Sequence, residues 1–169
     1  VLFRSELTNI KKELYLSIII DPDVEGPSLI ISSEGGTDIE KIAENNPEKI
    51  EKINFDPIIG LKPYQIRQIA SELDIPKPST VSFYNLLNNL QTAFSQIDST
   101  LIEINPLVID DNDNLIPLDC KINIDDDSYF RQKEIFELRD RNQENPMETK
   151  AKDFDLAYVK LDKGNVGCL

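Results

Sequence analysis

The chain has 169 residues, 40% hydrophobic and 29% charged, the profile of one globular domain or of one domain with part of another. Its formal net charge of −13 argues against partners such as nucleic acids and anionic membranes. No apolar run approaches the roughly 20 residues of a membrane span. Two well-separated cysteines indicate a reducing compartment. Histidine is absent, so any imidazole that the chemistry needs must come from another chain.

The first half of the chain predicts strands, turns and helices in alternation. Alternating apolar residues predict a strand over 13–21, and a proline-containing turn leads to a second strand over 28–33. Thr37 and Glu40 form a capping box that opens a helix ending near 45, and a strand follows over 50–55. Apolar stripes at helical spacing within 63–73 and 80–97 predict two helices that pack on a core.

The second half predicts two strands, over 101–109 and 115–123, then helices over 134–141 and 147–154 and a strand over 156–161. The chain does not begin with Met, and its last residues lie within a glycine-bearing motif. Both ends are therefore expected to be cuts from a longer protein.

The strands over 101–109 and 115–123 predict a hairpin whose polar turn is centred on Asn112. In that register one face is entirely apolar or proline, and we expect it to pack on a core. Its facing pairs are Ile102 with Ile122, Ile104 with Cys120, Pro106 with Leu118, and Val108 with Ile116.

The other face of this hairpin gathers the polar side chains. Asn105 lies opposite Asp119, and Glu103 lies opposite Lys121. Carboxylate and amide oxygens suit Mg²⁺, and a lysine beside them can contact a phosphate. From spacing alone, an exposed cross-strand ion pair is the favoured interpretation, because polar strand faces are common.

The turn itself, Asp110 to Asn114, is similar to the start of an EF-hand calcium loop. Leu115 stands where that loop needs glycine, and Lys121 stands where it needs glutamate. A solvated turn is therefore the preferred interpretation of this acidic run.

Several segments, in order and with matching spacing, resemble the beta subunits of succinate–CoA ligases. Residues 103–107 with 118–121 resemble the family's "EINPL … LDGK" pair, 12–16 its "KELYLG" strand, and 33–40 its "STEGGVEIE" segment. Further matches are Pro63-Tyr64-Gln65 with Arg67, Phe130-Arg131-Gln132, Arg139-Asp140, and Gly164 to Cys168.

The resemblance implies an α/β protein of the α+β ATP-grasp type. Residues 1–123 would be the second half of the ATP-grasp domain, incomplete at its N-terminus, and 124–154 a linker with helices. Residues 155–169 would form the first strand of a truncated, flavodoxin-like CoA-ligase domain. The segments that bind the base and close around succinate are missing, so the fragment is expected to be inactive alone.

The resemblance also implies an acid–thiol ligase of the tricarboxylic acid cycle that acts through succinyl phosphate and a phosphohistidine. Asn105 and Asp119 would be Mg²⁺ ligands, Lys121 would contact the nucleotide, and Glu103 would act catalytically beside the phosphohistidine loop. The nucleotide would be ATP/ADP or GTP/GDP. CoA would be bound mainly by an alpha subunit, in a heterodimer or heterotetramer.

The expected location is the cytoplasm, or the mitochondrial matrix in a eukaryote. Cys120 replaces the family's glycine between Asp119 and Lys121, and we expect its side chain to point into the core. Two alternatives stay open: a related ligase such as malate–CoA ligase, and a non-catalytic ATP-grasp interaction module.

Overall fold

The computed structural model describes residues 9–36, 39–138, 145–154, 156 and 158. It forms two compact units, 1–128 and 129–169. The capping box predicted at Thr37 lies outside the described residues. So does the strand predicted over 156–161, apart from Leu156 and Tyr158.

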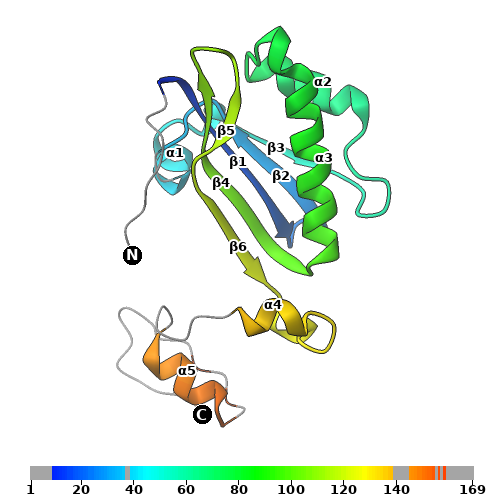
Figure 1. Cartoon of the computed structure of the whole chain (residues 1–169), viewed down its shortest axis with the longest axis vertical. Helices are drawn as coiled ribbons and strands as arrows, with labels where there is room; N and C mark the ends of the chain where they lie inside the picture. The colour runs from blue at the N-terminus through cyan, green and yellow to red at the C-terminus, as the bar shows by residue number, and fades with distance from the viewer. Residues whose placement is uncertain (1–8, 37–38, 139–144, 155, 157, 159–169) are drawn as a thin grey trace. The chain divides into compact units, whose positions relative to one another are not determined.

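The first unit is built on a six-stranded antiparallel sheet (Figure 1). The strands β1 (Ile10–Asp21) and β4 (Ser99–Asp110) are the longest and lie side by side at its centre. On the β1 side follow β2 (Gly26–Ser32) and β3 (Ile50–Asn54). On the β4 side, β5 (Leu115–Pro117) and β6 (Cys120–Ile124) both pair with β4.

The helices α2 (Pro63–Glu72) and α3 (Thr80–Gln96) supply the core on one face of the sheet, and α3 packs over β4 and β1 (Figure 1). Their predicted apolar stripes are confirmed, with Phe83, Leu87 and Ile66 at 2% exposure or less. They pack against apolar side chains of β1, β2 and β4. The short helix α1 (Ile39–Asn45) and the 3₁₀ turns η1 (Pro47–Lys49) and η2 (Lys77–Ser79) complete the connections.

The predicted hairpin register is confirmed on both sides of its middle. Glu103 pairs with Lys121 and Ile104 with Cys120, and beyond the middle Val108 pairs with Ile116. Between these pairs the predicted strand over 115–123 is interrupted, and it forms β5 and β6 in place of one continuous strand.

The expectation of one apolar face along the whole hairpin is wrong. Leu14 of β1 pairs with Leu107 but Leu16 pairs with Ile104, so Tyr15 alone faces two residues of β4, Asn105 and Pro106. This bulge reverses the alternation of faces. Before it, Ile102 and Ile104 belong to the core; after it, Leu107 and Ile109 do, whereas Val108 is buried outside that cluster.

The expectation that Cys120 points into the core is also wrong, because its side chain is exposed. Leu118 and Ile122, which were predicted to lie on the same face as Cys120, are also exposed, at 48% and 47%. The strand β6 pairs with β4 alone, while α3 covers β4 and β1. Helix α3 thus covers the centre of the sheet, and most side chains of the edge strand β6 stay exposed despite their apolar pattern.

In the second unit the described residues form the short helices α4 (Lys133–Glu137) and α5 (Pro146–Lys152). The ring of Tyr129 stacks edge-on against Phe136, with ring centroids 5.4 Å apart. In α5 the side chain of Asn145 caps the first turn by accepting the amide hydrogen of Met147. A 3₁₀ turn, η3 (Asp126–Ser128), ends the first unit. Among the described residues, no helix has the length and apolar character to cross a membrane.

Candidate functional site

The centre of the candidate site is Glu103 on β4. It pairs with Ser17 of β1 on one side and with Lys121 of β6 on the other. Glu103 is half-buried, Ser17 is fully buried and Lys121 is exposed. Because residues directly opposite one another share a face, the side chains of Glu103 and Lys121 both extend from the face away from the helix core.

Tyr15 belongs to this group, although no pattern in the sequence selects it. It is 3% exposed, two residues along β1 from Ser17, and hence on the same face. Burial raises the pKa of the Tyr15 hydroxyl, a contact with Ser17 lowers it, and the nearby Glu103 carboxylate raises it, with a net upward shift. The phenol is therefore neutral at physiological pH and lies close to the Glu103 carboxylate. A tyrosine in a strand is ordinary, so only the register across β1 and β4 identifies it.

Asn105 lies in the bulge, directly before a cis peptide bond to Pro106. Its Oδ1 accepts the amide hydrogen of Gly36 at 2.7 Å. The contact comes from the loop after β2, far away in the sequence.

Asp119 lies in the interruption between β5 and β6. The flanking pairs Ile104–Cys120 and Leu107–Pro117 place it in the segment that faces Asn105, and Leu118 N donates to Pro106 O at 3.1 Å within that segment. Asp119 Oδ1 accepts the amide hydrogen of Cys120 at 2.9 Å. That bond fixes one carboxylate oxygen and leaves Oδ2 for a ligand.

The donor set fits Mg²⁺ bound together with a nucleotide. Asn105 and Asp119 offer an amide oxygen and a carboxylate oxygen, both hard donors. Among the described residues, no three His, Cys, Asp or Glu side chains form a cluster that could hold a metal alone. A site of this kind suits Mg²⁺, which usually takes one or two carboxylates and fills its remaining positions with water and phosphate oxygens.

Residues 1–109 match the family model described as ATP-grasp domain. The chain belongs to the ATP-grasp family. The fold, which combines helices with an antiparallel sheet, confirms the predicted ATP-grasp fold class.

Relatives of the ATP-grasp chain include the beta subunits of ADP-forming succinate–CoA ligases. It is 45% identical to that of Macrococcus caseolyticus over 161 residues, 95% of this chain and 41% of the relative. For Desulforapulum autotrophicum the identity is 46% over 158 residues, 94% of this chain and 41% of the relative. For Bacillus subtilis it is 43% over 161 residues, 95% of this chain and 42% of the relative. The chain therefore spans less than half the length of these relatives.

A solved structure is similar in fold to this ATP-grasp chain. It is ATP citrate lyase from Methanosaeta concilii in complex with (3S)-citryl-CoA, with a TM-score of 0.52. The sequences are 17% identical, and the similarity covers 88% of this chain and 33% of that one. At this identity the likeness concerns the fold alone.

The acidic run of the ATP-grasp hairpin forms a turn, and the carboxylate of its first residue, Asp110, is already hydrogen-bonded within it. Asp110 Oδ1 accepts the amide hydrogens of Asn112 and Asn114 at 2.9 and 2.7 Å. Its Oδ2 accepts Asn114 Nδ2 at 2.9 Å. The Asn114 side chain and these amides hold the pKa of Asp110 below its usual value. Asp110 therefore stabilises the turn rather than offering oxygens to a cation.

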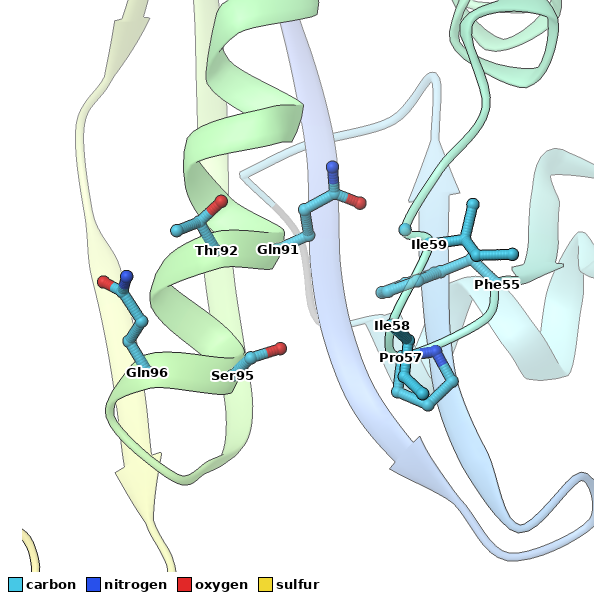
Figure 2. Close-up of a pocket in the computed structure, with 9 residues that line it drawn as sticks. Phe55, Pro57, Ile58, Ile59, Gln91, Thr92, Ser95 and Gln96 are labelled. Carbon is cyan, nitrogen blue, oxygen red and sulfur yellow. The ribbon is translucent and has the colours of Figure 1, made fainter.

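A cavity of about 280 Å³ lies away from these residues, between α3 and the loop that follows β3. Figure 2 shows amide and hydroxyl side chains of α3 on one side and the apolar loop on the other. Its lining contains no charged side chain and none of the predicted site residues. The lining residues are Phe55, Pro57, Ile58, Ile59, Gly60, Gln91, Thr92, Ser95 and Gln96. It offers no carboxylate to Mg²⁺ and no ammonium or guanidinium group to phosphate.

Proposed function

We propose that this chain is part of the beta subunit of a nucleotide-dependent succinate–CoA ligase and contributes the metal-binding hairpin of its ATP-grasp domain. The observation that carries the proposal is the register that brings Asn105, Asp119, Glu103 and Lys121 together on one hairpin. The relatives named above support the choice of ligase. The reaction converts succinate, CoA and nucleoside triphosphate into succinyl-CoA, nucleoside diphosphate and phosphate, and it is reversible.

Each residue has a defined part in this proposal. Asn105 and Asp119 would hold Mg²⁺ through their oxygens, and Lys121 would contact a phosphate as a point charge. The metal would neutralise phosphate charge that develops during transfer. Glu103, which lies close to Tyr15, would accept a hydrogen bond from an imidazole brought by an alpha subunit and favour its reactive tautomer.

The metal assignment is tested with Asp119→Ala in the full-length protein together with its partner subunit. Loss of a metal ligand should weaken Mg²⁺–nucleotide binding at least about tenfold. Removing a residue that only hydrogen-bonds a metal ligand already lowers metal affinity by about that factor. The fold should persist because Asp119 is exposed. Asp111→Ala is the matched control, since Asp111 is an exposed aspartate in the turn of the same hairpin. Calorimetric titration of Mg²⁺ and nucleotide measures the effect, and unchanged affinity in Asp119→Ala would exclude the assignment.

The partner is tested by labelling. The proposal places the phosphate-carrying imidazole on an alpha subunit, and the absence of histidine from this chain agrees with that placement. With γ-labelled nucleotide, label should appear on the alpha chain, and Glu103→Gln should slow its appearance more than it weakens nucleotide binding. Glu44→Gln, on the exposed side of α1, is the control. Label that accumulates on the beta chain, or full activity without an alpha chain, would contradict the proposal.

A further inference from the structure

The loop after β2 is tied to three other segments. Glu34 N donates to Ser32 Oγ at 3.1 Å, which closes the end of β2. The Glu34 carboxylate pairs with Lys49, just before β3. Gly35 N donates to the backbone oxygen of Glu13 on β1 at 3.1 Å. The loop is thus held against the central strand of the sheet at one position.

The close approach to β1 requires glycine. A Cβ on Gly35 would lie 2.5 Å from Leu14 O and 2.7 Å from Leu14 N, and backbone atoms cannot move aside as the end of a side chain can. Gly36 has a φ of +69°, a conformation that glycine adopts without strain. Together the two glycines turn the chain so that the Gly36 amide points at Asn105 Oδ1, 2.7 Å away.

That contact sets the orientation of the Asn105 amide. A side-chain carbonyl oxygen has two lone pairs, so Oδ1 can accept the Gly36 amide hydrogen and still coordinate a cation. With Oδ1 held by the loop, the NH₂ group is turned away from it, and the amide cannot flip without losing the bond. Partners that hold metal ligands in this way commonly govern affinity nearly as strongly as the ligands do.

We propose that the Gly35–Gly36 turn is a positioning element for the metal site, acting through the Gly36 amide on Asn105. The inference rests on the proposed function, in which Asn105 is a Mg²⁺ ligand. It assigns a role in metal binding to a loop that supplies none of the proposed metal ligands.

The test uses Gly35→Ala in the full-length protein with its partner subunit. The added methyl group must lift the loop from β1 and withdraw the Gly36 amide from Asn105. We expect Mg²⁺–nucleotide affinity to fall by about 10–100-fold, the usual effect of losing such a partner. Gly26→Ala is the matched control, because its Cβ would meet only Val24 O at an ordinary 3.7 Å, and it should leave the affinity unchanged.

A double-mutant cycle separates positioning from general damage. If the loop acts through Asn105, Gly35→Ala should have no additional effect on Mg²⁺ affinity once Asn105→Ala is present. Additive losses, or wild-type affinity in a folded Gly35→Ala protein, would overturn the inference. If Asn105→Ala alone leaves the Mg²⁺ dependence unchanged, the metal assignment itself fails, and this inference fails with it.

Hydrogen exchange without metal or nucleotide gives an independent readout, which also serves if Gly35→Ala does not fold. Asn105→Ala removes the acceptor of the Gly36 amide, so exchange at that amide should accelerate. Exchange at the Gly35 amide, bonded to Glu13 O, should change little. An unchanged Gly36 rate would show that the contact does not hold the loop in solution.

Discussion

Replacing Glu51 with Gln should remove much of the pH dependence of stability between pH 4.5 and 7. Glu51 on β3 pairs with Ile31 on the helix-covered face of the sheet, and its carboxyl group hydrogen-bonds Glu72, the last residue of α2. Gln68 also donates to Glu72, at 2.9 Å, and holds it in place. Two carboxyl groups can share such a bond only if one is protonated. The Glu72 contact, followed by burial, raises the pKa of Glu51 from 4.5 to about 7.

The size of the pH-dependent loss of stability follows from the shift in the pKa of Glu51. In the unfolded chain Glu51 ionises near its ordinary pKa, so between pH 4.5 and 7 the folded protein binds more protons and loses stability as pH rises. Each pKa unit corresponds to 1.36 kcal/mol, which sets an upper bound of about 3 kcal/mol for the full loss. Glu72 is exposed and water screens the pair, so we expect a loss of about 1–2 kcal/mol.

The assay is urea unfolding of wild type and Glu51→Gln at several pH values from 4.5 to 8. The variant should match wild type at pH 4.5 and be more stable by about 1–2 kcal/mol at pH 8, because glutamine keeps a donor for Glu72 without a charge. Glu72→Gln should reproduce the effect, and Glu44→Gln on α1 should not. An equal fall in stability in wild type and Glu51→Gln over this range would refute the shared-proton explanation.

Two further substitutions test the core and the edge of the sheet. Phe83→Ala should destabilise the protein by about 3–5 kcal/mol because Phe83 is fully buried, whereas Val81→Ala, 69% exposed on the same helix, should cost less than about 0.5 kcal/mol; urea unfolding measures both. Cys120→Gly should lower stability by no more than about 1 kcal/mol and leave Mg²⁺–nucleotide affinity unchanged, because the side chain is exposed on an edge strand. A loss comparable to that of Phe83→Ala would show that Cys120 packs in the core after all.

The periodic patterns of the sequence correctly predicted the two long helices and the hairpin register on both sides of the interruption between β5 and β6. The stripe that includes Phe83 and Leu87 predicted α3 and its buried face, because helical spacing directs those side chains to one side whatever they meet. The pairing of Glu103 with Lys121 followed from a polar turn of fixed length between two apolar strands. These are local constraints, and each is readable from neighbouring residues.

Only the tertiary structure decided which faces are buried and what holds the site. The bulge at Asn105 and Pro106 depends on how β1 lies beside β4, and the exposure of Cys120 depends on where α3 ends its cover of the sheet. The bond from Gly36 to Asn105 joins residues 69 positions apart. Such contacts arise from the packing of distant segments, and a single sequence carries no local pattern that reports them.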